Sequence, residues 1–351
     1  MALVIPGVGY RFDDITIVMQ AGEGVKRTKR RPRWGWLPVF ERRLGPQHAV
    51  LIAGSGRSGT TWLAQVVNHD HSYRYYHEPF GPAVSPALRP VLYLRRGNRD
   101  ERYVIPVERV LHGQRVWNWL RSNEYNRSVQ PYDRVVFSKR LIKECRANLW
   151  LHWLRDRHPE LPIIFVIRHP VAVAHSTIQR RLPNVYQEYF LQKELVTDHL
   201  APFYDRLVAA RSGPEWDQHV LNWCIQNYVP LRELTTQNTH LVFYENLILE
   251  PEAELQRLFR FLGYDLTGDM QTAFATPSST TRRNSAIRTG ADALGAWKNE
   301  VSESDRRRAL ELIALFGLDA IYSTELPDRE AAQALLEQSC SPAVEPPAVV
   351  R

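Results

Sequence analysis

A glycine- and hydroxyl-rich loop is the sequence feature that points most directly to chemistry. Residues 54–63 read Gly-Ser-Gly-Arg-Ser-Gly-Thr-Thr-Trp-Leu and lie between a predicted buried strand, 48–53, and a predicted helix, 60–68. Glycines in such a turn let the backbone approach an anion, and backbone N–H groups and Ser and Thr hydroxyls donate hydrogen bonds to it. The pattern therefore predicts a site for a phosphate-like group, with Arg57 as its cation.

This loop differs from the phosphate loop of nucleotide-hydrolysing proteins in two ways. Thr60 stands where the pattern GxxxxGK[ST] requires Lys, and the cation lies inside the loop at Arg57. The predicted strands do not end in an Asp that could hold magnesium, and strand 162–167 is followed by Arg168. Because phosphoryl transfer from ATP depends on that metal, an ATP-dependent small-molecule kinase is the weaker alternative.

A second group of anion-binding residues follows the strand at 162–167. Arg168 leaves the end of this strand, Pro170 follows it, and Ser176 lies two helical turns beyond Arg168. Both side chains can therefore face one anion beside the first loop, and Arg180 lies one turn further along the same helical face. The alternative is that Arg168 forms a buried ion pair and Ser176 is an ordinary helix residue.

Together the two motifs resemble those of sulfotransferases that use 3′-phosphoadenosine-5′-phosphosulfate (PAPS). In that family the first motif binds the 5′-phosphosulfate, and an Arg, a Pro and a Ser eight residues after the Arg bind the 3′-phosphate. The resemblance covers about residues 48–320 and implies that PAPS is the sulfuryl donor, released as 3′-phosphoadenosine 5′-phosphate (PAP), with no metal required. The implied cofactor-binding residues are Arg57, Ser58, Gly59, Thr60, Thr61, Trp62, Arg168, Ser176 and Arg180.

Two later stretches also resemble this family. Residues 240–247 resemble its Tyr-Glu-Asp-Leu strand end, with Asn246 in place of Asp. The resemblance implies that Tyr244 frames the adenine and that Trp62 stacks on it, while both aromatics could instead belong to the core.

The second of these stretches begins at Arg288. Arg288-Thr289-Gly290 resembles the family's Arg-x-Gly loop over the 3′-phosphate, although Thr289 replaces the usual Lys. It precedes Gly295-Ala296-Trp297-Lys298-Asn299 with two extra residues between the glycines. Arg288 and Gly290 are therefore further candidates for cofactor binding.

Transfer to a hydroxyl also needs a base for the acceptor proton and cations for the sulfuryl oxygens. Glu78 lies 21 residues after Arg57, a spacing that resembles tyrosylprotein sulfotransferases, and Glu-Pro-Phe (78–80) resembles carbohydrate 6-O-sulfotransferases. The resemblance implies that Glu78 is the general base. A Glu-Pro turn that caps a helix is the structural alternative, and His77 is the rival base.

Small-molecule sulfotransferases instead use the His of a Lys-Thr-His motif after the second strand, which we predict at 134–138. The equivalent triplet is then Lys139-Arg140-Leu141, with Leu where the His would be. This favours Glu78 over any histidine. Lys139, expected at the carboxyl end of that strand, is predicted to contact the leaving oxygen and the sulfuryl group, with Arg140 as the alternative.

The elements that must position these residues alternate between short apolar strands and amphipathic helices. The predicted strands are 48–53, 134–138, 162–167 and 239–244, and the helices that follow them are 60–68, 146–157, 171–180 and 252–262. This alternation predicts an α/β fold with a parallel sheet covered on both faces. We therefore expect a P-loop NTPase-like central sheet flanked by helices.

The remaining segments suggest the domain organisation. Residues 1–47 form a basic appendage, 48–325 the sulfotransferase domain and 326–351 a Pro-rich tail, while 81–133 looks like an insertion near the acceptor site. Lys26 to Arg33 is a basic run that could bind nucleic acid or an anionic surface. A non-catalytic binder acting through this run is the alternative from another functional class, although no nucleic-acid partner is expected.

Composition indicates a globular protein with a substantial core. Its 351 residues are 44% hydrophobic and 24% charged, values that exclude a disordered or collagen-like chain. The net charge of +7 comes mainly from Arg, which binds phosphate and sulfate well. The three cysteines lack metal-ligand spacing, and neither a signal peptide nor a membrane span is evident, so we expect a cytoplasmic enzyme. The acceptor is expected to be a saccharide, a glycolipid or a small alcohol.

Overall fold

The computed structural model describes residues 40–41, 45–81, 85–113, 136–137, 139–275 and 294–338. The basic run from Lys26 to Arg33 and the candidate residues Arg288 and Gly290 lie outside the described residues. No helix in the described ranges is both long and apolar enough to cross a bilayer.

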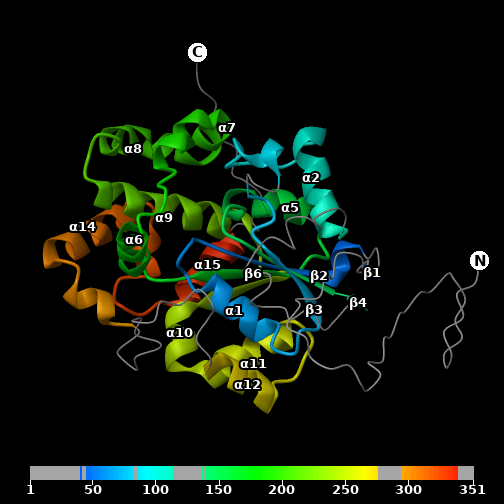
Figure 1. Ribbon diagram of the computed structural model, residues 1–351. Helices are drawn as coiled ribbons and strands as arrows, with labels where there is room; N and C mark the ends of the chain where they lie inside the picture. Colours follow the sequence, from blue (N-terminus) through cyan, green and yellow to red (C-terminus); the bar gives the residue numbers. More distant parts are fainter. Residues whose placement is uncertain are drawn as a thin grey trace, which may run out of the picture.

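A parallel sheet forms the centre of the fold, as predicted, but it has five strands rather than the four expected (Figure 1). Its order is β3-β5-β2-β6-β7. The strands are β2 (Ala49–Gly54), β3 (Tyr73–His77), β5 (Lys139–Glu144), β6 (Ile163–Ile167) and β7 (Thr239–Phe243). Because all the pairings are parallel, the carboxyl ends of the strands share one edge. The strand order changes direction at β2, and ligands bind at such a point in open α/β sheets.

Helices cover both faces of this sheet, so its strands are buried on both sides. Along β2, Leu51 belongs to one apolar cluster and Ile52 to the other, and both are fully buried. Figure 1 shows α1, α11 and α12 on one side of the sheet and α5, α6, α9 and α14 on the other. The helices on the first side are α1 (Thr60–Val67), α10 (Tyr244–Leu249), α11 (Pro251–Phe261) and α12 (Gly268–Ala275).

The second face of the sheet carries the larger cluster of buried apolar residues. Its helices are α5 (Leu151–Arg157), α6 (Pro170–Gln179), α9 (Glu215–Glu233), α14 (Glu303–Ala314) and α15 (Arg329–Gln338). Further helices are α2 (Glu101–Leu111), α7 (Lys193–Leu195) and α8 (Tyr204–Ala210). The long helix α9 packs against α6, α14 and α15.

The predicted strands at 48–53, 162–167 and 239–244 are confirmed to within about one residue, but the one at 134–138 is wrong. There the short β4 (Val136–Phe137) pairs with β1 (Phe40–Glu41) in a separate two-stranded sheet. The strand of the main sheet is β5, whose sequence KRLIKE carries charges on buried positions. A buried charged strand has no apolar run, and for this reason the sequence pattern misplaced it.

Candidate active site

The predicted phosphate loop connects the end of β2 to the start of α1. Asn148 Oδ1 accepts a hydrogen bond from Gly54 N at 3.1 Å and so fixes the end of the strand. Arg57 and Gly59 adopt left-handed backbone conformations, with φ of +74° and +89°. A Cβ at Gly59 would lie 2.7 Å from the ring of Tyr244, so only Gly fits there. The loop therefore makes a tight turn directly before the N-terminus of α1, a place where backbone N–H groups can bind an anion.

The hydroxyl groups of this loop differ in burial and in their partners. Ser58 is fully buried, and its Oγ has no hydrogen-bond partner among the described residues. Buried polar groups are rarely left unpaired. Thr60 is also buried, and its Oγ1 lies 3.6 Å from Cys145 Sγ at the end of β5, while Thr61 is partly exposed.

The structure brings the two predicted anion-binding motifs together. Arg57 Nε donates a hydrogen bond to Ser176 Oγ at 3.0 Å, and Arg168 Nη1 donates one to the carbonyl oxygen of Arg57 at 3.1 Å. Arg180 ends the same helix as Ser176 and is partly buried. Trp223 Nε1 donates to the carbonyl of Arg168 at 3.0 Å, and this contact fixes the end of β6. Loop and strand end therefore form one cationic site.

The guanidinium of Arg168 is held in place but retains donors for a ligand. Its central carbon lies 4.1 Å from the ring centroid of Tyr244. Its Nε is buried and has no hydrogen-bond partner in the described part of the chain. A planar cation with unused donors at this position suits a phosphate.

Trp62 and Tyr244 are more deeply packed than an open stacking platform would be. Trp62 is 5% exposed, its ring centroid lies 6.0 Å from that of Tyr244 and 4.5 Å from that of Phe274, and its Nε1 donates to the carbonyl of Phe274. Burial raises the pKa of Tyr244 above its usual value, so its phenol stays protonated.

Glu78, the base expected from the sequence, directly follows β3, and its ion-pair partner is Lys143. In the register of β3 with β5, His77 lies opposite Lys143, and Glu78 N donates to the carbonyl of Lys143 at 2.7 Å. The ammonium of Lys143 then donates to Glu78 Oε1. Lys143 is 3% exposed, whereas 41% of the Glu78 side chain is exposed. The pair therefore has one buried member and one member that solvent can reach.

The charges of this pair are well defined. Burial opposes ionisation of Glu78, but Lys143 and then His77 outweigh it, so the pKa of Glu78 lies below its usual value. Burial also disfavours the charge on Lys143, but the acidic groups around it, including Cys145 and Glu78, raise its pKa. Both are therefore ionised near neutral pH. Burial lowers the pKa of His77 to about 4, so this rival base is neutral, and its Nδ1 lies 2.9 Å from the hydroxyl of Tyr75.

A buried carboxylate holds the Glu-Pro-Phe turn. Glu144 is fully buried and accepts hydrogen bonds from the backbone N–H groups of Phe80 and Arg146, each at 2.9 Å. Burial raises its pKa to about 7. Glu144 therefore positions the chain on either side of the Glu78–Lys143 pair.

The expected place of Lys139 is wrong. Lys139 begins β5, so it lies at the opposite end of the strand from the phosphate loop, and its Nζ donates to the hydroxyl of Tyr264 at 2.5 Å. Arg140 is 1% exposed and donates to the carbonyl of Gly45 at 3.0 Å. The triplet that ends the strand is Lys143-Glu144-Cys145, with Cys in the position where small-molecule sulfotransferases have His. Because β5 ends at Glu144, six residues after the predicted boundary at Ser138, the sequence pattern did not identify Lys143.

The late Gly-x-Trp-Lys-Asn stretch contacts the second motif. Trp297 stacks on His169, the neighbour of Arg168, with centroids 4.8 Å apart. Lys298 instead forms an ion pair with Glu325. The stretch thus supports the end of β6, while the Arg288–Gly290 segment lies outside the described residues.

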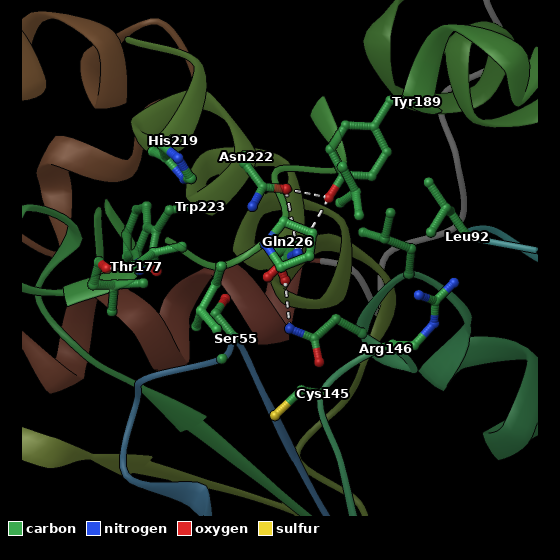
Figure 2. A pocket seen from close by; sticks show the side chains of 17 residues that line it. Ser55, Leu92, Cys145, Arg146, Thr177, Tyr189, His219, Asn222, Trp223 and Gln226 are labelled. Atoms are coloured by element: carbon green, nitrogen blue, oxygen red, sulfur yellow. Dashed lines mark hydrogen bonds between the residues drawn. The ribbon is translucent and has the colours of Figure 1, made fainter. Parts of the chain in front are cut away.

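A cavity of about 140 Å³ opens beside the loop (Figure 2). Ser55 and Gly56 of the loop, Cys145 after β5, α6 and the segment 182–189 line it. Helix α9 also lines the cavity and supplies several polar side chains. Sequence reasoning missed α9, because polar residues on a helix are read as its solvent-facing side.

Comparisons with known proteins agree with these motifs. The model of the sulfotransferase family matches residues 49–268. A Caenorhabditis elegans protein named "Putative protein-tyrosine sulfotransferase" is 25% identical over 187 residues, which are 50% of this chain and 62% of that protein. The chain thus spans less than two thirds of this curated relative.

The solved structures that resemble this chain share a lower sequence identity with it. The sulfotransferase domain of the Synechococcus PCC 7002 olefin synthase is 14% identical, with 80% of this chain and 98% of that chain covered and a TM-score of 0.41. Mouse sulfotransferase SULT7A1, solved in complex with PAP, is 16% identical, with coverage of 87% and 92% and a TM-score of 0.39.

Proposed function

The chain belongs to the sulfotransferase family, and from this premise we propose that it transfers the sulfuryl group of PAPS to an acceptor hydroxyl and releases PAP. The observation that carries the proposal is the contact between the two anion-binding motifs. Arg57 bonds to Ser176, and Arg168 bonds to the backbone of Arg57. A nucleotide with anionic groups at both its 5′ and 3′ positions can therefore engage both motifs at once.

The residues present fit PAPS. The unpaired hydroxyl of Ser58 and the unpaired Nε of Arg168 are buried donors that await acceptor oxygens. We assign the 5′-phosphosulfate to the loop from Arg57 to Thr61, and the 3′-phosphate to Arg168 and Ser176. PAPS supplies an activated sulfuryl group whose leaving group is a phosphate. Arg57 and the amides of the loop neutralise the charge that develops there.

The family resemblance supports the assignment of residues to the adenine and to the loop that closes over the 3′-phosphate. We assign Tyr244 and Trp62 to the adenine, with Arg180 next to the 3′-phosphate at the end of α6. Arg288 and Gly290 are proposed to close over the same phosphate. The packing of Trp62 against Phe274 implies that it offers an edge rather than an open face to the base.

Glu78 is the proposed general base, and Lys143 replaces Lys139 as the neighbouring cation. The lowered pKa of Glu78 keeps its carboxylate ionised, and its partial exposure lets it accept the proton of an acceptor hydroxyl. Lys143 orients this carboxylate and provides positive charge near the reacting oxygens. The proton moves from the acceptor hydroxyl to Glu78 as the new O–S bond forms and the bond between the sulfur and the 5′-phosphate oxygen breaks, with PAP as the leaving group.

The acceptor is proposed to be a saccharide, a glycolipid or a small alcohol. The Glu-Pro-Phe sequence at 78–80, which resembles a motif of carbohydrate 6-O-sulfotransferases, supports a sugar-containing acceptor. The name of the C. elegans relative makes protein tyrosine the second candidate.

Two measurements test this function. The protein should bind PAP in the absence of magnesium much more tightly than ADP, as titration calorimetry can determine, and a kinase would show the reverse order. Incubation with ³⁵S-labelled PAPS and a cell extract should yield a labelled product whose sulfate ester is identified by mass spectrometry. Deletion of residues 1–40 should leave PAP affinity unchanged. Binding of PAP no tighter than ADP, or no labelled product, contradicts the proposal.

A further inference from the structure

Resting on the proposed function, we propose that the cavity beside the phosphate loop binds the non-reacting hydroxyls of a compact polyhydroxylated acceptor of the sugar type. In this proposal the side-chain amides of Asn222 and Gln226 on α9 form hydrogen bonds with those hydroxyls. The argument rests on which atoms of these side chains are already paired, on the size of the cavity and on its charge.

The two amides form a network that leaves one donor and one acceptor unused. Asn222 Oδ1 accepts from Tyr189 Oη at 2.6 Å and from Gln226 Nε2 at 3.3 Å, and Gln226 Nε2 also donates to Tyr189 Oη at 3.2 Å (Figure 2). Within the described residues, Asn222 Nδ2 and Gln226 Oε1 have no partner. These contacts fix both amides while leaving complementary groups for a ligand.

An unused donor beside an unused acceptor matches hydroxyl groups. A hydroxyl both donates and accepts, so one hydroxyl or two adjacent ones can satisfy Asn222 Nδ2 and Gln226 Oε1 together. Cys145 lines the same cavity and lies two residues after Lys143, the ion-pair partner of Glu78, so the cavity adjoins the base. The reacting hydroxyl must lie at Glu78, and the hydroxyls at α9 are therefore additional ones. An acceptor that satisfies both places carries at least two hydroxyls.

The size and the charge of the cavity narrow the class of acceptor further. At about 140 Å³, the cavity is smaller than the roughly 300–1,000 Å³ of sites for drug-sized ligands, so it suits a single ring. Among its described lining residues there is no Asp or Glu, while Arg146 adds a guanidinium whose hydrogen bond goes to the carbonyl of Arg89. A cavity with positive and no negative side chains disfavours amine-bearing acceptors. A neutral or anionic sugar ring meets all these conditions.

Matched acceptors and matched variants test the proposal. Methyl β-glucopyranoside and cyclohexylmethanol both carry a primary hydroxyl on a six-membered ring, but only the first has further ring hydroxyls. We expect sulfation of the glucoside in preference to cyclohexylmethanol and to N-acetyltyrosinamide. Gln226→Met and Asn222→Ala should each raise KM for the glucoside about 10-fold, the loss of about one hydrogen bond.

The control is Gln256→Met, which changes an exposed Gln on α11. It should leave KM unchanged, and all three variants should keep the wild-type Kd for PAP, which also shows that they fold. Equal use of cyclohexylmethanol, preference for the phenol, or an unchanged KM in both α9 variants overturns the inference. A wild-type protein that binds PAP but sulfates no hydroxylated ring, in the panel or in an extract, overturns it as well. Failure of the wild type to bind PAP would instead refute the proposed function.

Discussion

Replacement of Glu78 by Gln separates the chemical role of this residue from its structural one. The buried ammonium of Lys143 loses its carboxylate, although the amide oxygen of Gln can still accept its hydrogen bond. Removal of one partner of a fully buried pair costs about 3–5 kcal/mol. Because 41% of the Glu78 side chain is exposed and solvent screens the pair, we expect about 1–2 kcal/mol in the free energy of unfolding.

The double variant completes a cycle that tests this reasoning. Lys143→Met removes the buried charge, so Glu78→Gln with Lys143→Met should regain most of the lost stability in urea unfolding at pH 7. Turnover should follow a different pattern. Glu78→Gln should retain PAP affinity and lose about 10²–10⁴-fold in kcat, the usual contribution of a general base, and the double variant should regain none of it.

Lys139→Met is the matched control, because the same side chain is changed on the same strand at the opposite edge of the sheet. Its kcat should equal that of the wild type. Near-normal turnover in Glu78→Gln would remove this residue as the base. A double variant less stable than Glu78→Gln would refute the role of the ion pair, and an inactive Lys139→Met would refute the placement of the site.

Three other predictions address the remaining parts of the structure. Arg168→Ala should weaken PAP binding about 10- to 100-fold, the value of charged hydrogen bonds to phosphate, yet leave the affinity for adenosine 5′-phosphosulfate nearly unchanged in calorimetry. Gly59→Ala should lower the free energy of unfolding by about 1–3 kcal/mol, because its φ is +89° and its Cβ would meet the ring of Tyr244, and a wild-type melting temperature would contradict the strained loop. Burial lowers the pKa of His240 to about 4 from 6.5, so the stability that its neutral ring contributes is present above pH 6.5 and is lost as the pH falls towards 4. At about 1.4 kcal/mol per unit, His240→Gln should lose up to about 3 kcal/mol less than the wild type between pH 7 and pH 4 in urea unfolding, and identical losses would contradict the lowered pKa.

Local rules explain what the sequence by itself determined. The loop from Arg57 to Gly59 is recognisable because a turn that exposes N–H groups to an anion needs glycines between a strand and a helix. The pair of Arg168 and Ser176 follows from helix periodicity, since eight residues span about two turns. Apolar strands such as β6 can be predicted from their composition. These features depend on a few consecutive residues, so no knowledge of distant contacts is needed to predict them.

Tertiary structure alone decided which lysine lies beside Glu78. In β5, Lys143 is buried because Glu78, 65 residues earlier, neutralises it, and Arg140 is buried because it reaches the carbonyl of Gly45. A strand whose charges are satisfied by distant partners cannot be distinguished from a solvent-exposed one in the sequence. The same holds for Asn222 and Gln226, which line a cavity together with residues of the phosphate loop and of α6 that are distant in the sequence. Burial of polar groups is a property of the assembled fold, and pairings between remote residues determine it.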